Sequence, residues 1–371
     1  MAEVRELLIP ADALQRVAEA VLRHAGSEPE EARVVAEHLV RANLAGHDSH
    51  GVGMIPYYVR FVRQGLLRPN TPARLLADEG PILRFEGGRG YGQRVAREAI
   101  AAGIERCRTL GVSVVTLRHA HHVGRVGTYG EQAAQAGLVS IHWVNVQDHP
   151  PLMAPFRGSD ARFGTNPVCV TIPRPGRAGP VLLDMATSRI ALGKVRVCMN
   201  KGEPVPEGHL IDHRGRPTRD PRVMFRDERR GALLPIGEHK GYGLALAAEL
   251  LAGVLSGGGT IQPAIPRKGS IVNNMLSVLL DPERFGDPEW MQAEIDAMVA
   301  YAKASPPANP DEPVLAAGEP ERLAAARRRE QGIPVDPTTW EEILDAGESV
   351  GLARAEAEGL AGLGTGQPPL G

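Results

Sequence analysis

The fold class depends most on the stretch Val112-Ser-Val-Val-Thr-Leu-Arg-His-Ala-His-His-Val-Gly-Arg-Val-Gly127. Its first six residues are mainly β-branched or apolar, which predicts a buried strand over 112–117. Residues 95–110, before it, carry apolar side chains at helical spacing, and residues 127–136, after it, predict a further helix. Helices alternating with a buried strand indicate an α/β or α+β sheet domain.

Glycine spacing in the same stretch argues against a Rossmann dinucleotide fold. Gly124, Gly127 and Gly130 follow a Gly-x-x-Gly-x-x-Gly pattern, whereas the Rossmann turn requires Gly-x-Gly-x-x-Gly after a strand. The segment 87–92 is also rich in glycine but lacks that spacing. Glycines of this kind are frequent in ordinary turns. The glycine spacing therefore disfavours a classical dinucleotide-binding fold.

Working outward, apolar strand-like and helical segments interleave over some two hundred residues. Further strands are expected at 138–144, 168–172, 181–183 and 275–280, with helices at 241–255 and 290–304.

Both ends of the chain differ from this middle part. The first 65 residues predict three helical stretches, with Gly26 ending the first, and Ser27 with Glu30 resembles a capping box that opens the second. After residue 306 the chain is rich in Pro, Gly, Ala and charge. A helix is predicted there at 319–331, and 362–371 is expected to fray.

Composition narrows the function classes. The chain has 371 residues, enough for two domains, with 43% hydrophobic residues, 4% aromatic residues and a net charge of −2. These values argue against a nucleic-acid partner, and no apolar run approaches the roughly 18 residues that span a membrane. Three scattered cysteines indicate neither a zinc site nor a disulfide framework. We therefore expect a cytoplasmic protein.

Five of the twelve histidines fall in the segments 46–51 and 118–125. Histidine titrates near neutral pH and suits proton transfer to a reacting oxygen. His50, preceded by Asp48 and Ser49, is the leading acid/base candidate. A helix-capping Asp-Ser pair beside an exposed histidine is the simpler interpretation of the same residues.

The second histidine segment admits a metal site, and with it a metal-dependent hydrolase or lyase. However, His119, His121 and His122 have no carboxylate nearby at ligand spacing, and no His-Glu-x-x-His helix occurs. No metal is therefore predicted.

Three further segments have the character of binding loops. Thr165 lies at an Asn-Pro turn before a strand, and residues 184–188 end a strand with small polar side chains, where open sheets place ligands. His239 and Lys240 precede a long apolar helix. A lysine is unfavourable at a helix N-terminus unless an anion lies nearby, although a surface lysine is the alternative.

Taken together, these motifs resemble the malate/L-lactate dehydrogenase family, which lacks a Rossmann fold, and most closely its hydroxycarboxylate dehydrogenase branch. The resemblance extends from about Leu14 to Val335. Its components are Asp48-Ser-His-Gly51, His122-Val-Gly124, Ala154-Pro-Phe156, Gly164-Thr-Asn-Pro167, Asp184-Met-Ala-Thr-Ser188, Gly193-Lys194, Asn200-Lys-Gly-Glu-Pro-Val-Pro206 and His239-Lys-Gly241.

The resemblance implies a homodimer that reduces small 2-oxo acids, such as those related to malate or lactate, with NADH or NADPH. It also implies a mainly helical domain made from both chain ends, 1–78 with 305–371, beside a mixed-sheet NAD(P)-binding domain over 79–304.

Residue roles follow from the same resemblance. His50 matches the family's proton donor, Ser49 its relay partner, and His122 a histidine that serves as acid/base in some members. The substrate would contact Thr165, with Lys194, Arg125 and His122 as candidates for its carboxylate. Cofactor contacts match His122, Val123, Gly124, Arg125, Asp184, Met185, Ala186, His239, Lys240, Gly318, Glu319 and Pro320.

Two positions depart from the imine-reducing members of that family. Those members carry an arginine four residues after the proton donor, where this chain has Met54, and an aspartate where it has Lys194. The departures favour a hydroxy acid over a cyclic imino acid, whose reductase is the alternative.

Overall fold

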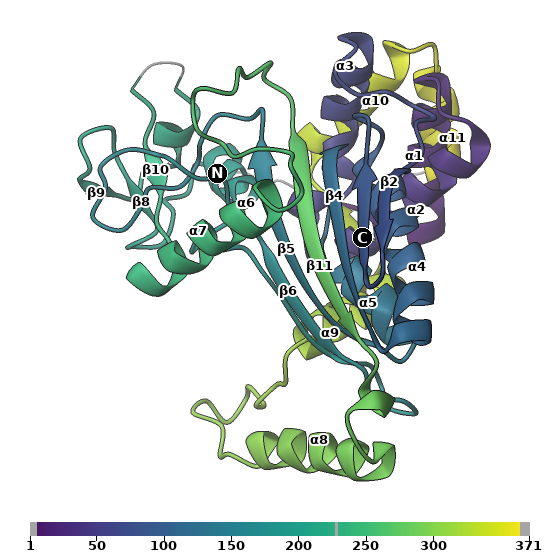
Figure 1. Cartoon of the computed structure of the whole chain (residues 1–371). Helices are drawn as coiled ribbons and strands as arrows, with labels where there is room; N and C mark the ends of the chain where they lie inside the picture. The colour runs from purple at the N-terminus through teal and green to yellow at the C-terminus, as the bar shows by residue number, and fades with distance from the viewer. Residues whose placement is uncertain (1–5, 227–228, 364–371) are drawn as a thin grey trace.

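A computed structural model, which describes residues 6–226 and 229–363, is built around a mixed seven-stranded sheet (Figure 1). The strands lie in the order β2-β3-β4-β11-β5-β6-β7. Their bounds are β2 Arg74–Glu79, β3 Ile82–Glu86, β4 Val112–His121, β5 Val139–Gln147, β6 Val168–Ile172, β7 Val181–Met185 and β11 Val272–Leu280. The β3–β4 pair is parallel and the other pairs are antiparallel. The predicted mixed α/β class is confirmed.

Strand β11 is inserted between β4 and β5, far from both in sequence. It is buried along almost its whole length, as expected for a strand covered on both faces. Helices α4 (Gly92–Leu110) and α5 (Gly127–Gln135) cover one face of the sheet, and α7 (His239–Gly253) covers the other (Figure 1).

Helices from the two ends of the chain form a second hydrophobic core beside the sheet. Strand β1 (Leu7–Ile9) pairs with β12 (Ile333–Val335), so the ends of the chain are tied together. The helices and short 3₁₀ turns of this part are α1 Ala11–His24, α2 Pro29–Leu44, η1 Asp48–His50, η2 Val52–Met54, α3 Ile55–Arg63, α9 Glu319–Gln331, α10 Pro337–Glu348 and α11 Arg354–Ala361.

We propose that the discontinuous helical part, 1–78 with 305–371, and the sheet part, 79–304, are the two domains. The boundary at 78/79 falls inside β2, which pairs with β3 of the sheet part. Two segments of the proposed helical domain lie outside the described residues, namely 1–5 and 364–371. The second segment includes most of the end that is expected to fray, 362–371.

Two smaller parts are attached to the sheet. A three-stranded sheet of β8 (Leu210–Ile211), β9 (Pro217–Thr218) and β10 (Ala232–Leu233) packs near α6 (Leu192–Lys201) and the turn η3 (Pro221–Met224). After the turn η4 (Pro282–Arg284), helix α8 (Pro288–Lys303) extends away from the main body (Figure 1).

The structure corrects two local predictions and contains elements that were not predicted. Strand β4 continues to His121 instead of ending at Leu117, so most of the second histidine segment lies within the sheet. Ser27 is not a helix cap: its hydroxyl donates to the Glu31 carboxylate, and Glu28 occupies the cap position. The hairpin β2–β3 and the last two helices, α10 and α11, were not predicted.

Within the described residues, no helix is both long and apolar enough to cross a membrane.

His142, at the centre of the sheet, predicts acid sensitivity. The side chain is fully buried on β5, with Nδ1 2.8 Å from the Ser277 hydroxyl and Nε2 2.9 Å from that of Ser140. Burial lowers its pKa from 6.5 to about 3. Between these values the unfolded chain binds a proton that the folded chain does not, so the free energy of unfolding falls as the pH decreases.

We therefore expect His142→Gln to reduce this pH dependence by up to about 1.4 kcal/mol per pH unit between about pH 6 and pH 4. Urea unfolding at several pH values measures the slope. His24→Gln, at an exposed position, is the control and should leave it unchanged. An unchanged slope in His142→Gln would show that this histidine is protonated in the folded chain.

Candidate active site

A register shift near the end of β4 decides where the clustered histidines point. Arg118 and His119 together oppose the single residue Asn274 of β11, which is a β-bulge. His119 has φ +51°, and its N–H donates to the Asn274 amide oxygen at 2.9 Å. Its ring faces Glu86, 3.2 Å away. The bulge thereby separates His119 from the histidines that follow it.

The glycine-rich segment 87–92 packs closely against the backbone at this end of β4. A Cβ added to Gly92 would lie 2.3 Å from the His121 carbonyl oxygen, and one added to Gly87 would lie 2.7 Å from the Ala120 Cα. The absence of a side chain at these glycines therefore allows the two backbone segments to approach closely. His121 itself is fully buried, with its ring edge-on to Phe61 at 5.2 Å.

His122 leaves the strand and is held from the helical part. The Tyr58 hydroxyl of α3 lies 2.7 Å from its Nδ1, and the Gln93 side-chain amide donates to the same hydroxyl at 2.6 Å. Because Tyr58 accepts from Gln93, its own hydrogen is free to donate to Nδ1. This arrangement leaves the hydrogen of a neutral His122 on Nε2.

His50 closes the short turn η1, which is anchored from both ends of the chain. The Asp48 carboxylate accepts from both Nη atoms of Arg328 on α9, at 2.7 and 3.0 Å, and from the Asn43 amide at 2.7 Å. A Cβ at Gly51 would lie 2.1 Å from the Asn43 Oδ1, so only glycine fits there. The position of His50 therefore depends on a residue 278 positions later, Arg328.

The rings of His50 and His122 stack with their centroids 5.4 Å apart and their planes at 17°. The Ser49 hydroxyl lies 3.1 Å from the His50 Nδ1. Burial lowers the pKa of His50 to about 4, with the charges of His47 and Arg125 acting in the same direction. Burial also holds the pKa of His122 well below 6.5. Both rings are therefore neutral near pH 7, and each keeps Nε2 available to a ligand.

Lys194 lies on α6 (Leu192–Lys201), which contacts η1, and Thr165 lies in the loop before β6. The Thr165 carbonyl accepts from both the backbone and the hydroxyl of Thr187, at 2.9 and 2.8 Å, so the loops before β6 and after β7 are joined. Lys194 is exposed in the first turn of α6. The preceding Gly193 packs on Ser49, since a Cβ there would lie 2.5 Å from the Ser49 Cβ.

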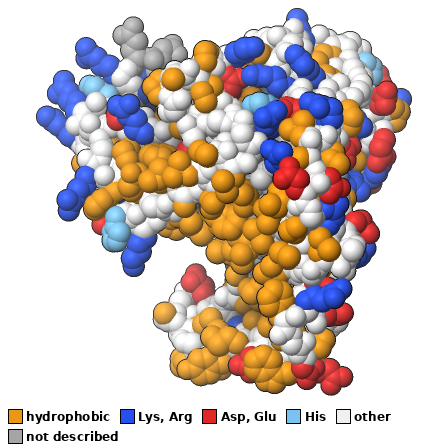
Figure 2. Space-filling model, viewed as in Figure 1, with side chains coloured by type: hydrophobic (Ala, Val, Ile, Leu, Met, Phe, Trp, Pro, Cys, Tyr) orange, Lys and Arg blue, Asp and Glu red, His pale blue; other side chains and the backbone are white. Residues whose placement is uncertain are grey.

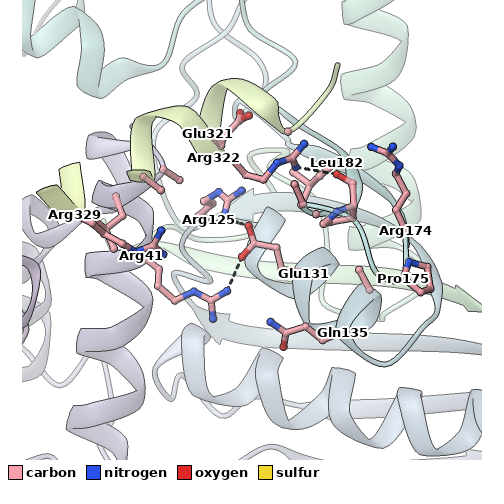
Figure 3. Close-up of a pocket in the computed structure, with 18 residues that line it drawn as sticks. Arg41, Arg125, Glu131, Gln135, Arg174, Pro175, Leu182, Glu321, Arg322 and Arg329 are labelled. Carbon is pink, nitrogen blue, oxygen red and sulfur yellow. Dashed lines mark hydrogen bonds and ion pairs between the residues drawn. The ribbon is translucent and has the colours of Figure 1, made fainter. Parts of the chain in front are cut away.

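Arg125 lines a neighbouring cavity (Figure 3). It is 3% exposed, its Nη1 donates to Glu131 at 2.8 Å, and its Nε lies 3.5 Å from the Asp184 carboxylate. Asp184 also accepts from the Gly127 N–H at 2.9 Å, and burial raises its pKa. Arg125 therefore lies between two carboxylates at the wall of this cavity.

Val123 and Gly124 complete the loop between the two sites. Val123 is buried and its N–H donates to the Asn273 side chain at 2.9 Å. The His38 imidazole accepts from the Arg125 N–H at 3.0 Å, and a Cβ at Gly124 would lie 2.4 Å from that same His38 nitrogen. Burial lowers the pKa of His38 to about 3, which fits its role as an acceptor.

The remaining expected cofactor residues form two groups. Met185 and Ala186 follow Asp184, and Gly318 caps α9 with φ +88° beside Leu182, followed by Glu319 and Pro320. His239 and Lys240 are exposed at the start of α7, and the His239 ring packs edge-on to Phe156 at 5.7 Å. The Ile236 N–H donates to the Thr187 carbonyl, which places this helix start near the end of β7.

Sequence reasoning missed the residues that hold these side chains. They are Asn43, His38, Tyr58, Gln93, Glu131 and Arg328. Most lie in helices whose hydrophobic pattern indicates ordinary packing. The one sequence signal for such residues is a polar side chain on the apolar face of a helix, as with His38 and Asn43 of α2. Among the residues that the structure describes, no three His, Cys, Asp or Glu side chains are grouped as a metal site.

Comparison with known proteins agrees with the earlier resemblance. A family model described as malate/L-lactate dehydrogenase matches residues 9–344. Hydroxycarboxylate dehydrogenase B of Escherichia coli O157:H7 is 47% identical over 344 residues, covering 92% of this chain and 94% of that protein. An L-lactate dehydrogenase of Cupriavidus necator is 44% identical over 319 residues, covering 86% and 91%.

A solved structure agrees at the level of the fold. An Escherichia coli structure assigned to the malate/lactate dehydrogenases superposes with a TM-score of 0.91 at 44% identity, covering 96% of this chain and 98% of that one. The predicted family and class of enzyme, a hydroxycarboxylate dehydrogenase of the malate/lactate type, are confirmed. The chain belongs to the malate/L-lactate dehydrogenase family.

Proposed function

We propose that this chain interconverts a small 2-hydroxy acid and its 2-oxo acid, with a nicotinamide nucleotide as the second substrate. One observation carries the proposal: two neutral imidazoles, His50 and His122, stack 5.4 Å apart with each Nδ1 held by a hydroxyl. Such a pair can exchange one proton with an alcohol while hydrogen-bonding the same oxygen.

The residues around Arg125 fit a nicotinamide nucleotide. The Nε and Nη2 atoms of Arg125 are buried without a hydrogen-bond partner, which favours a bound anion. A Cβ at Gly127 would lie 2.8 Å from that Nη2, so glycine keeps this cationic surface open. Arg125, Met185, Ala186 and Gly318 would hold the nucleotide, which when bound accepts or supplies the hydride at C2 of the acid.

His50 moves the proton in this proposal. In the oxidation direction its neutral Nε2 takes the proton of the 2-hydroxyl group, and in reduction the protonated ring returns it to the developing alkoxide. The Ser49 hydroxyl accepts from Nδ1–H, which keeps the Nε2 lone pair toward the substrate. His122, with its hydrogen on Nε2, donates to the substrate oxygen and orients it.

We assign the substrate carboxylate to Lys194 and Thr165. Lys194 stands in the first turn of α6, directly after the glycine that packs on Ser49. Its ammonium group and the helix N-terminus both favour a negative charge there. Met54 offers no cation, because its thioether is uncharged, and it packs against the helical core. The imine reductase alternative relies on an arginine at that position, so a hydroxy acid suits this chain better.

We also propose a homodimer. Helix α8 has no buried residue and extends from the body, and it exposes Trp290, Met298 and Tyr301. Figure 2 shows hydrophobic side chains running continuously toward it over the face that includes α7. Leu250 of α7 is exposed. Patches of this extent mark interfaces. In a dimer, α8 of each chain would cover the hydrophobic face of the other chain, because every copy carries both the helix and the face.

For the compartment we propose the cytoplasm, since Cys107, Cys169 and Cys198 are all free thiols, as in a reducing environment.

The first prediction concerns the proton donor. We expect wild-type protein to oxidise the reduced nicotinamide with small 2-oxo acids, and His50→Gln to lower kcat about 10²- to 10⁴-fold while nucleotide affinity stays within about twofold. Turnover is followed by nicotinamide absorbance and affinity by calorimetry. His24→Gln is the matched control. Near-normal turnover of His50→Gln would transfer the role to His122, and faster turnover of a cyclic imino acid would favour the imine reductase.

The second prediction concerns the carboxylate anchor. Lys194→Gln should raise the KM for the 2-oxo acid about 10- to 100-fold and leave nucleotide affinity nearly unchanged, because one charge-assisted contact is lost. Lys194→Arg should recover much of the lost affinity, since it keeps the charge. Steady-state kinetics with varied oxo acid provide the measurement. A KM that does not move would remove Lys194 from the substrate site.

The third prediction concerns assembly. Light scattering should give about twice the chain mass of 39.7 kDa for wild type, and Trp290→Glu combined with Tyr301→Glu should give the monomer. These side chains are 63% and 76% exposed within one chain, so the changes need not disturb its fold. Glu294→Gln, on the same helix, should leave the dimer intact. A dimeric double variant would place the interface elsewhere.

A further inference from the structure

A cavity of about 510 Å³ lies at the junction of α2, α5, the β6–β7 turn and the start of α9 (Figure 3). Its lining is dominated by arginine. Five arginines and two glutamates face it: Arg41, Arg125, Arg174, Arg322, Arg329, Glu131 and Glu321. Three of these arginines are paired with carboxylates outside the lining: Arg174 with Asp296 at 2.8 Å, Arg125 with Asp184 at 3.5 Å and Arg41 with Glu37 at 3.7 Å. Arg322 and Arg329 form no ion pair with any described residue, so they leave uncompensated positive charge in the cavity.

Arg125 is the buried part of this wall. It is 3% exposed, and two of its three guanidinium nitrogens, Nε and Nη2, have no hydrogen-bond partner. A buried guanidinium with unsatisfied N–H groups is costly unless an anion completes it. This second observation, independent of the charge excess, indicates a ligand with several acceptor oxygens.

The carboxylates of the cavity are already engaged. Glu131 bridges Arg125 at 2.8 Å and Arg41 at 2.6 Å, and Glu321 lies 3.3 Å from the His47 ring. Nucleotide sites that accept an unphosphorylated ribose usually offer a free carboxylate to its 2′-hydroxyl, whereas an arginine accommodates a 2′-phosphate. This cavity offers arginines and no free carboxylate among its described residues, so it corresponds to a site for a 2′-phosphate.

Helix α9 contributes the accessible cations. Arg322 and Arg329 are seven residues apart and so lie on one face of the helix. Arg322 Nη1 donates to the Pro180 carbonyl at 3.0 Å, which fixes the side chain over the cavity and leaves its other N–H groups available. Arg329 has no hydrogen bond or ion pair with any described residue.

The cavity adjoins the segments expected to bind the nucleotide. Arg125 and Gly318 line it and also belong to those segments. Leu182, another lining residue, is two positions before Asp184, and Glu321 reaches His47, three residues before His50. A nucleotide whose nicotinamide lies at His50 could therefore place its far end here.

We propose that this cavity binds the 2′-phosphate of the adenosine end of the nucleotide, so that the enzyme uses NADPH in preference to NADH. The inference rests on the proposed function only in taking the second substrate to be a nicotinamide nucleotide. Arg322 and Arg329 contact the phosphomonoester, and Arg125 provides buried positive charge behind it. Arginine suits this task because its planar N–H groups match phosphate oxygens.

Calorimetry with nucleotide fragments tests the proposal without turnover. Adenosine 2′,5′-bisphosphate should bind wild type at least about 10-fold more tightly than adenosine 5′-monophosphate, and NADPH more tightly than NADH. The preference should weaken with added salt. Arg322→Gln combined with Arg329→Gln should abolish it, lowering the bisphosphate affinity about 10- to 100-fold while the monophosphate affinity changes little. Arg327→Gln, at an exposed position of α9 outside the cavity, is the matched control.

Two results would overturn the inference. Equal affinity of wild type for NADH and NADPH would exclude a 2′-phosphate site, and a preference that survives in the double variant would place the site elsewhere. Neither bears on the proposed function, which fails separately if no 2-oxo acid is reduced with either nucleotide. A double variant with intact circular dichroism and unchanged monophosphate binding confirms that the chain is folded.

Discussion

The bulge between β4 and β11 is the constraint on which the arrangement of the site depends. A regular strand directs alternate side chains to opposite faces, so His119 and His121 would share a face. The extra residue at Arg118–His119 changes that alternation. His119 then reaches Glu86, His121 enters the core, and the next residue, His122, leaves the strand toward the helical part. One irregularity thus separates a cluster that resembles a metal site into three environments.

The second requirement is that the two ends of the chain meet. His50 lies on a three-residue turn, η1, that has few hydrogen bonds of its own. Asn43 and Arg328 fix the position of this turn by hydrogen-bonding the Asp48 carboxylate. The β1–β12 pair and the helical core fix α9 relative to the first helices. The same helix carries Arg322 and Arg329 to the cavity, so one element supports both the proposed proton-transfer pair and the proposed nucleotide pocket.

Burial then sets the chemistry. Placing His50 and His122 side by side in a partly closed site penalises the imidazolium form, so both rings are neutral and differ only in which nitrogen carries hydrogen. Ser49 and Tyr58 decide that difference by hydrogen bonding at Nδ1. Arg125 is the opposite case, because it remains charged in the interior through Glu131 and Asp184. The interior therefore separates a neutral histidine pair, the proposed acid/base site, from a cationic pocket.

The sequence by itself determined the class of fold, most strands and helices of the central part, and the leading candidates His50 and His122, because hydrophobic periodicity and local motifs are properties of neighbouring residues. It also excluded the Rossmann turn through glycine spacing. Tertiary structure alone decided the position of β11 between β4 and β5, the extension of β4 to His121, and the turning of Arg125 into the cavity. Tyr58 and Arg328 likewise gained their roles only on folding. Contacts between residues so distant in sequence leave no local pattern, since they depend on packing and on the burial of charge rather than on spacing.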